Sequence, residues 1–557
     1  LDSDRVGAIA IIDPDNGYSP IIQPGPGLAV DDPTQYRLSA EDGSASEDRF
    51  KSEETRMGLQ LDLRHETRLF GDWLLENFLG YSGDFREKTF EFDPKSFDEF
   101  TDPDLELTLA DPIFFGGDRL GGFFEDHDRS YEFGPYFADN RVEELFDSRG
   151  AVELQRTPDD ESDDFFDAFV DNYEANEDIQ ALYFMQRLEI ADWEVTYGLR
   201  YERTANEFQN REIITEGDAG FFISPGLWKF LEPEDFSREA TTERDYSHLL
   251  PAFSVRKRMF GDKFQIRAAV NQTIARPDFD DLVPREIPGI SGSRYSNSVQ
   301  LANLDLEATE STNYDLIFDY FPEELGFYSI GFFYKALDGV IFTESRTVDA
   351  GDPLATRLAS VYRSDFDGSA KNPWSIRRRA NTGEGFVYGI EVSARRGFDD
   401  FLPDWLHGLG VEGNFSINES GVDLLLEERF GEEVPLFNQS DEFGNLSLFF
   451  ERAGFFGRVS FQYRSDYLIS VLGGDEVNTI TDPGKFNLPA DSLDVYEDAS
   501  SEVDLTLRYR FENGLSFYLE ARNVLNEPRR RYRGDGSRIE SVRYTDASYF
   551  VGVKYLF

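Results

Sequence analysis

The chain ends in the stretch Tyr549-Phe550-Val551-Gly552-Val553-Lys554-Tyr555-Leu556-Phe557, which separates into two faces when every second residue is taken. One face is entirely apolar or aromatic: Tyr549, Val551, Val553, Tyr555 and Phe557. The other face is mixed: Phe550, Gly552, Lys554 and Leu556. Successive side chains of a β-strand point to opposite sides of a sheet, so this period of two predicts a terminal β-strand.

The same alternation recurs far upstream, which makes a chance pattern in one segment a poor explanation. Apolar residues on one face again alternate with polar residues on the other in three more segments: Val503 to Phe511, Glu194 to Glu202, and Ile390 to Arg395. Two all-β architectures produce such a pattern. A soluble sandwich buries its apolar face in a core, whereas a membrane barrel turns that face to lipid and lines a wet lumen with the other.

The lengths of the connections favour the barrel. Short turns are predicted at Leu69–Asp72, Ala191–Asp192, Phe260–Asp262, Glu323–Gly326, Arg452–Gly454 and Glu512–Gly514. Long, polar, irregular stretches are predicted at 93–177, 206–243, 277–308, 347–374 and 470–500. An alternation of short turns and long loops is typical of outer-membrane barrels, and compact soluble domains rarely contain several long structureless loops. We therefore predict an antiparallel transmembrane β-barrel with extracellular loops and periplasmic turns.

The composition argues against catalytic chemistry. The 557 residues include no cysteine and only four histidines, which are scattered along the chain. A thiolate nucleophile and a cysteine zinc site are therefore excluded, and no metalloprotease, phosphate-loop or serine-hydrolase motif is present. No apolar run is long enough for a spanning helix, and the aromatic content of 15% suits interfacial girdles. We do not expect an enzyme.

The net charge of -54 bears on partners. A surface this acidic disfavours nucleic acid, which needs cationic side chains against its phosphates. The acidic blocks fall mostly in the predicted loops, where they are simplest to explain as a solvated, mutually repelling surface. Ca2+ is the one cofactor that the sequence suggests, with Asp13, Asp15, Asp159 and Asp160 as candidate ligands. Their spacing matches no defined calcium loop.

Several segments, taken in order, resemble TonB-dependent outer-membrane receptors. The most distinctive is Ala275-Arg276-Pro277-Asp278-Phe279 followed by Leu282 and Pro284. Further similar segments are Asn303–Glu307, Asn313–Leu316, Gly331–Lys335, Asn381–Gly383, Gly389–Glu391, Tyr463–Tyr467 and Glu520–Asn526. Together they extend over roughly residues 53–557. The most similar subgroup is the proteobacterial one often associated with carbohydrate uptake.

The resemblance implies a location in the bacterial outer membrane and a barrel of about 22 strands around an N-terminal plug, within the range of known barrels. It also implies energy supplied by the TonB complex through a short N-terminal box. We find neither box nor plug here, and only about fifteen strands by periodicity, an odd count for a bacterial barrel. We therefore expect a C-terminal portion of a receptor: residues 53–557 as barrel with a long loop at 93–177, and residues 1–52 as an extracellular loop or an incomplete upstream segment.

Candidate ligand contacts lie in an aromatic-rich part of the long loop: Phe114, Phe115, Phe123, Phe124, Asp126, Asp128, Arg129, Tyr131 and Tyr136. Such rings stack on sugar faces while charged groups bind hydroxyls, although the rings could equally form a small core of the loop itself. Inward charges on the last strands, namely Arg508, Arg510, Glu520 and Arg522, would contact a plug or line the channel. Trp73, Trp193 and Trp405 lie near short turns and suit the headgroup boundary.

The implied function is energised import of a scarce solute. An oligosaccharide is the preferred cargo, because an acidic surface repels anionic ferric siderophores, which are the alternative. A passive porin and a surface-binding barrel also remain open. The expected partners are outer-membrane lipid, the TonB complex acting through the missing N-terminal part, and the ligand. A surface lipoprotein or a second polypeptide that completes the barrel would add to these.

Overall fold

The computed structural model describes residues 8–13, 16–24, 45–71, 73–97, 99–100, 115–117, 120–123, 131–133, 136–137, 154–155, 171–213, 237–291, 294–322, 326–349, 351–362, 373–381, 383–471, 488–545 and 547–555. Within these ranges the chain is nearly all β, and no helix is both long enough and apolar enough to cross a membrane.

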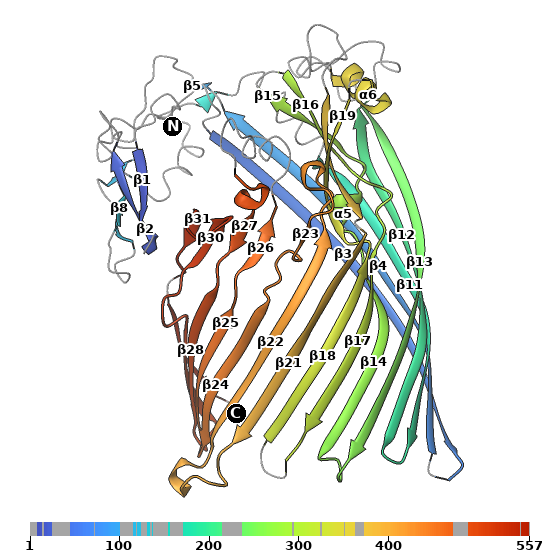
Figure 1. Cartoon of the computed structure of the whole chain (residues 1–557), viewed down its shortest axis with the longest axis vertical. Coiled ribbons are helices and arrows are strands. Elements are labelled where there is room, and N and C mark those ends of the chain that lie inside the picture. Colours follow the sequence, from blue (N-terminus) through green and yellow to red (C-terminus); the bar gives the residue numbers. More distant parts are fainter. Residues whose placement is uncertain are drawn as a thin grey trace.

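Fifteen of the described strands follow one another in a single antiparallel sheet, as the count from the sequence predicts. The strands are β3 (Ala45–Leu69), β4 (Trp73–Phe97), β11 (Tyr173–Ile190), β12 (Trp193–Ile213), β13 (Ser237–Met259), β14 (Phe264–Ala275), β17 (Thr309–Tyr320), β18 (Gly326–Asp338), β21 (Glu384–Gly397), β22 (Leu409–Asp423), β24 (Glu442–Arg452), β25 (Phe455–Arg464), β28 (Ser500–Arg510), β29 (Leu515–Arg522) and β32 (Ser548–Tyr555). Figure 1 shows them tilted side by side and curving into a barrel wall.

The wall has two edges, β3 and β32. Among the described strands, β3 pairs only with β4, and β32 pairs only with β29. Strand β3 pairs with β4 along its whole length, from Ala45 opposite Phe97 to Leu69 opposite Trp73. An unpaired strand edge in lipid leaves backbone polar groups unsatisfied. The described strands form a curved barrel wall that is open between these two edges.

The short turns at one end of the barrel confirm the predicted connections. Five of the six contain a residue with positive φ: Phe70 and Gly71, Ala191, Phe260 to Asp262, Ala453 and Gly454, and Gly514. The sixth predicted turn, Glu323–Gly326, lies outside the described residues except for Gly326, where β18 begins. A tight antiparallel turn requires such a conformation, which costs a non-glycine residue strain. The five described turns lie at the bottom of Figure 1, at the other end of the wall from the loop sheets.

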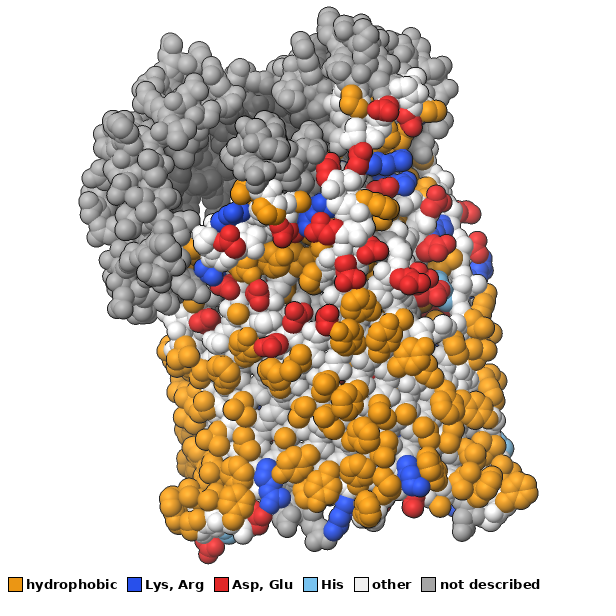
Figure 2. Space-filling view, in the orientation of Figure 1, with side chains coloured by type: hydrophobic (Ala, Val, Ile, Leu, Met, Phe, Trp, Pro, Cys, Tyr) orange, Lys and Arg blue, Asp and Glu red, His pale blue; other side chains and the backbone are white. Residues whose placement is uncertain are grey.

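The outer face of the sheet is apolar. Leu63, Leu79, Phe184 and Leu199 lie directly opposite one another across four strands. Their exposed fractions of 69%, 52%, 46% and 44% would be unfavourable in water. Figure 2 shows apolar side chains covering the lower part of the wall, with acidic side chains gathered above them towards the long loops. This distribution fits a surface that contacts lipid in its lower part and water above.

The inner face is polar and carries ion pairs. Glu76 on β4 is fully buried and accepts hydrogen bonds from Arg64 on β3 and Arg187 on β11. Asp319 on β17 is also fully buried, and it accepts from Arg267 Nε at 3.0 Å and Ser329 Oγ at 2.7 Å. Buried charges are tolerated only when they are paired and hydrogen-bonded. These side-chain ion pairs and hydrogen bonds link neighbouring strands on the lumen side.

The long connections are less irregular than the sequence predicted. The expectation of loops at 93–177 and 206–243 is wrong at their edges, because β4, β11, β12 and β13 continue into them. The connections also contain their own structure. Strands β15 (Glu286–Ser291), β16 (Arg294–Leu301), β20 (Trp374–Asn381) and β19 (Ile341–Val348) form one loop sheet, and β26 (Tyr467–Ser470), β27 (Val495–Glu497), β30 (Arg529–Arg533) and β31 (Ile539–Arg543) form a second.

Smaller elements complete these connections. Helix α5 (Phe279–Leu282) follows β14, and helix α6 (Pro353–Tyr362) lies near the first loop sheet, to which Arg357 is joined by a 2.5 Å ion pair with Glu286 on β15. Short 3-10 turns are η4 (Asp404–Leu406), η5 (Glu427–Arg429) and η6 (Ala490–Leu493), and β23 (Glu433–Val434) pairs with β22. Upstream, β1 (Ala8–Asp13) pairs with β2 (Asn16–Pro24), and β5 (Glu99–Phe100) pairs with β10 (Leu154–Gln155).

Candidate ligand-binding mouth of the barrel

Helix α5 is anchored inside the wall at its long-loop end. Phe279 and Leu282 are 8% and 1% exposed and belong to one apolar cluster with Tyr173 on β11 and Phe208 on β12. Tyr173 and Phe208 are on the same side of the sheet as the lumen ion pairs, since both positions share the strand parity of Arg187 and Glu202. The apolar residues of the segment 275–284 therefore hold a short helix against the inner wall at the mouth of the barrel (Figure 1).

The arginine of this segment fixes the chain on the polar wall below α5. Arg276 donates through Nε to Thr204 Oγ1 at 3.0 Å and pairs with Glu202, which Arg200 also contacts. One strand away, Arg86 donates to Glu177 Oε2 at 3.1 Å, and its guanidinium lies 5.0 Å from the ring of Phe279. Helix α5 is thus held by apolar contacts of Phe279 and Leu282, and the guanidinium groups of Arg86 and Arg276 lie beside it.

Between α5 and the first loop sheet lies a pocket of about 270 Å³, which we call the arginine pocket. Its charged lining residues are Arg285, Arg377, Arg378, Arg379, Asp280 and Asp281. Gln300 and Thr343 add an amide and a hydroxyl. Burial raises the pKa of the Asp281 carboxyl, although Arg379 lies 3.1 Å away and favours its charged form. The arrangement brings the guanidinium groups of Arg285, Arg377 and Arg379 to one hollow of a strongly acidic chain, whereas Arg378 alternates with Arg377 and Arg379 along β20 and pairs with Glu344 on the other face of the loop sheet.

A second polar hollow, of about 730 Å³, lies where the wall opens between β13 and β14. These strands pair only as far as Ala252 opposite Asn271, although β13 begins at Ser237 and extends well beyond that point. Six acidic residues are among those that line the hollow, and His248 lies 3.5 Å from one of them, Glu310. It is a solvated, acidic gap on the loop side of the wall.

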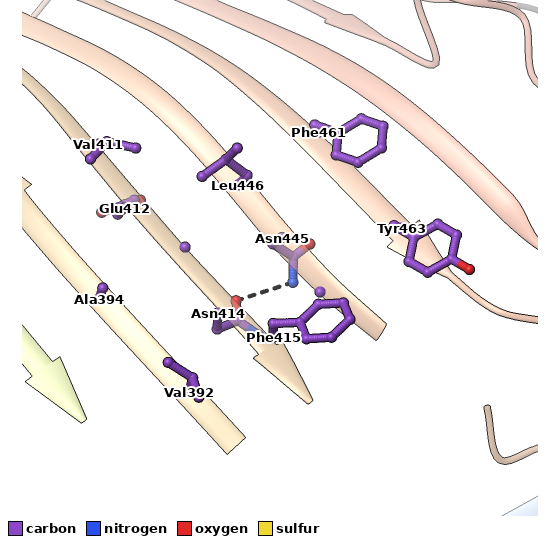
Figure 3. Close-up of a pocket in the computed structure, with 12 residues that line it drawn as sticks. Val392, Ala394, Val411, Glu412, Asn414, Phe415, Asn445, Leu446, Phe461 and Tyr463 are labelled. Atoms are coloured by element: carbon purple, nitrogen blue, oxygen red, sulfur yellow. Dashed lines mark hydrogen bonds between the residues drawn. The ribbon is translucent and has the colours of Figure 1, made fainter. Parts of the chain in front are cut away.

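A third hollow, of about 550 Å³ and with a mostly apolar lining, belongs to the outer face and not to the mouth. Figure 3 shows residues from four adjacent strands around it. Val392, Val411, Leu446 and Phe461 share the strand parity of the lipid-facing residues. In a membrane, lipid hydrocarbon would fill this hollow. On the opposite, inner face, Asn445 donates to Asn414 at 3.3 Å across β22 and β24.

Comparison with known proteins settles the family. The model of the family described as TonB dependent receptor-like, beta-barrel, matches residues 10–524. The chain belongs to the TonB-dependent receptors. This assignment also places it in the bacterial outer membrane. No curated protein is detectably similar in sequence.

Solved structures of receptors share the fold at low identity. The pyoverdine receptor FpvA from Pseudomonas aeruginosa PAO1 is 12% identical, with a TM-score of 0.51 over 92% of this chain and 54% of that one. The siderophore receptor PiuA from Acinetobacter baumannii is 11% identical, with a TM-score of 0.50 over 91% and 56%. The ferric-catecholate receptor Fiu from E. coli K12 is 11% identical, with a TM-score of 0.50 over 90% and 55%. The chain thus spans little more than half the length of these receptors.

The predicted aromatic ligand loop is only partly described in this receptor. Strand β6 (Phe115–Gly117) pairs with β9 (Tyr136–Phe137), which sets Phe115 opposite Phe137. Strand β7 (Leu120–Phe123) pairs with β8 (Tyr131–Phe133), which sets Phe123 opposite Tyr131. The backbone therefore places the predicted positions Phe115, Tyr136, Phe123 and Tyr131 in two short ladders, the first two in one and the last two in the other. Other predicted contacts lie outside the described residues: Phe114, Phe124, Asp126, Asp128 and Arg129.

The predicted inward charges all fall on the polar face of the last strands. Arg508 lies opposite Tyr518, Arg510 opposite Ser516, and Glu520 opposite Thr506, while the apolar residues alternate with them. Arg522 Nη2 lies 3.4 Å from Glu520 Oε2. This ion pair is exposed, so it contributes little to stability. The strand register places the four residues on the same inner face of the wall, but it does not gather them into one binding site.

The candidate calcium ligands are not assembled by the described residues. Asp13 is the last residue of β1, whereas Asp15, Asp159 and Asp160 lie outside the described part of the receptor. Among the side chains that are described, no group of three or more histidine and carboxylate residues is arranged to hold a metal ion.

The arginine pocket was not predicted from the sequence, although the run Arg377-Arg378-Arg379 was a visible signal in so acidic a chain.

Proposed function

We propose that this receptor imports a scarce solute across the outer membrane, with energy from the TonB complex. The observation that carries the proposal is the pairing of a lipid-facing apolar face with an ion-paired polar lumen in a chain of this family. A polar lumen suits a hydrated solute, and binding with gated passage requires no catalytic constellation.

Two classes of cargo have support. A neutral oligosaccharide is supported by the net charge of -54, which does not penalise an uncharged solute. An anionic ferric chelate is supported by the arginine pocket at the mouth, since planar guanidinium groups suit carboxylate and phosphate oxygens. The solved receptors named above are described as siderophore, pyoverdine and ferric-catecholate receptors. We rank the anionic chelate first, because a local binding site outweighs a distant, salt-screened surface charge.

The complete receptor would contain further strands and a plug domain in addition to the described wall. Edge strands β3 and β32 leave backbone groups that lipid cannot satisfy. Further strands, from the same polypeptide or a second one, would close the barrel between them. A plug domain that contacts the inward charges Arg508 and Arg522 would close the lumen and transmit the pull of TonB.

Uptake by whole cells tests the function. Cells expressing the full-length receptor would take up radioactive iron supplied as an anionic chelate, or a labelled oligosaccharide, and the same cells lacking TonB would take up neither. Uptake that continues without TonB would instead indicate a passive porin. Surface binding with no uptake in either strain would indicate a binding or adhesion barrel.

A further inference from the structure

The arginine pocket joins two elements that are far apart in sequence. Its floor is formed by α5 and Arg285, which the apolar cluster around Phe279 holds on the inner wall. Its other wall is the polar face of the loop sheet formed by β16, β19 and β20. On that face Arg377 lies opposite both Gln300 and Ser345, and Arg379 lies opposite Thr343. The strand pairing thus fixes the positions of the donor groups.

The cations of the pocket differ in how far they are already neutralised. Arg378 pairs with Glu344 at 2.5 Å, Arg379 with Asp281 at 3.1 Å, and Arg285 with Asp171 at 2.8 Å. Arg377 is exposed and has no carboxylate partner among the described residues. Its guanidinium is therefore the group with unused binding capacity.

The two carboxylates of the pocket are engaged by other groups. Asp280 accepts a hydrogen bond of 2.6 Å from the hydroxyl of Tyr173, and Asp281 accepts from Arg379 Nε. Asp171, which faces the pocket through Arg285, is also partly buried, and burial raises its pKa. Their charges are thus offset locally, although they still weaken the positive field of Arg285, Arg377 and Arg379.

We infer that the arginine pocket binds a small ligand carrying at least two anionic oxygen groups, with Arg377 contacting one group and Arg379 another. Alternate residues of a strand are about 6.6 Å apart, which suits two carboxylates of one molecule better than a single compact ion. Gln300 and Thr343 supply neutral donors beside them. The volume of about 270 Å³ admits a small polycarboxylate, or the anionic end of a larger chelate. This inference rests on the proposed import function and names the chemistry of its cargo.

Equilibrium binding to the purified full-length receptor in detergent tests the pocket. The probes are citrate, inorganic phosphate and the neutral trisaccharide maltotriose, each measured by calorimetry at low and at high salt. Citrate is expected to bind more tightly than phosphate, and its affinity should fall as salt rises. Maltotriose should show no binding at this site. Phosphate binding as tight as citrate binding would overturn the two-group geometry.

Two substitutions on the same loop sheet separate a binding role from a structural one. Arg377→Gln should weaken citrate binding about tenfold, the effect of losing one charge-assisted hydrogen-bonding group. Arg346→Gln is the matched control, because Arg346 is exposed on the other face of the sheet, opposite Ile376, and should leave citrate affinity unchanged. Equal affinity of wild type and R377Q would overturn the inference. TonB-dependent uptake of a neutral sugar, together with no citrate binding, would overturn the pocket while leaving the import function intact.

Discussion

The ring of Phe333 lies against Gly389, directly across the ladder between β18 and β21. A Cβ atom on Gly389 would lie 2.8 Å from Cζ of that ring and would also clash with the backbone carbonyl of Ile417. The relationship recurs at other directly opposed pairs: Gly80 with Tyr183, Gly410 with Phe449, Gly421 with Phe386, and Gly552 with Tyr518. An aromatic ring lying over a strand glycine covers the exposed backbone and pins the register.

Gly389→Ala should therefore destabilise the folded barrel. Because backbone as well as ring must move, we expect a cost of about 1–3 kcal/mol, the usual range for overpacking. Refolding in detergent over a urea series, followed by the shift of the folded band on an unheated gel, measures this cost. Gly58→Ala on β3 is the control, since nothing lies within 4 Å of its added Cβ atom. Equal midpoints for G389A and G58A would show that the ring packing contributes nothing.

A buried ion pair joins two of the long connections. Arg429 in η5 donates to both carboxylate oxygens of Asp494, just after η6, at 2.6 and 2.9 Å. Both side chains are almost completely buried. Asp494→Asn would remove the more deeply buried of the two carboxylates that pair with the guanidinium and leave Glu432 in place, which should cost up to about 3–5 kcal/mol. We expect the connections around Arg429 and Asp494 to open, and backbone hydrogen exchange by mass spectrometry to rise there while the barrel strands stay protected.

An exposed ion pair on the second loop sheet provides the comparison for Asp494→Asn. Arg533 and Glu540 lie 2.6 Å apart with 39% and 28% of their side chains exposed. Glu540→Gln should change hydrogen exchange little, because exposed pairs contribute about 0–1 kcal/mol. If D494N exchanged no faster than E540Q in the segments around residues 429 and 494, the buried pair would not hold these connections together.

The same cluster predicts a sensitivity to acid. Arg429 donates to both oxygens of Glu432, at 2.9 and 2.7 Å, and this hydrogen bonding lowers the pKa of the Glu432 carboxyl below its ordinary value of 4.5. A depressed pKa in the folded state gives a stabilisation that is complete above pH 4.5 and is lost as the pH falls from 4.5 through the lower, folded-state value.

Hydrogen exchange around residues 424–434 should therefore accelerate below pH 4.5, after correction for the intrinsic pH dependence of exchange. Glu432→Gln removes the titrating group, so its exchange at neutral pH should already be raised and should change less on acidification. An identical acid response in wild type and E432Q would assign the titration to another group.

The strands could be predicted from the sequence because lipid on one side of the wall and water on the other require apolar and polar side chains to alternate along each strand. This requirement produced the pattern at Tyr549–Phe557 and its relatives upstream. The short turns were also predictable, since Gly71, Gly454 and Gly514 occupy positions that need positive φ. Local residue types decide these features.

The site could be predicted much less well. The arginine pocket depends on Arg285 meeting Arg377, 92 positions later, through a parallel pairing of β16 with β20 that no local pattern announces. The extra strand lengths in β12 and β13 were missed for a related reason. The ends of β12 and β13 towards the long connections extend beyond the lipid into water, and many of their residues on both faces are polar. The alternation of apolar and polar residues therefore stops before the backbone pairing of the two strands stops.

Lipid contact of the outer face yields the last prediction, a pair of lysine substitutions on one strand. Leu199 on β12 is exposed on the apolar face and lies opposite Phe184, whereas Thr196 lies on the inner face opposite Arg187. Leu199→Lys should destabilise the barrel by about 2–4 kcal/mol if the residue is near the bilayer midplane, because a cation must then be desolvated in hydrocarbon. Thr196→Lys places the same charge towards the lumen and should cost much less. Folding in lipid vesicles measures both, and equal costs would contradict lipid contact at Leu199.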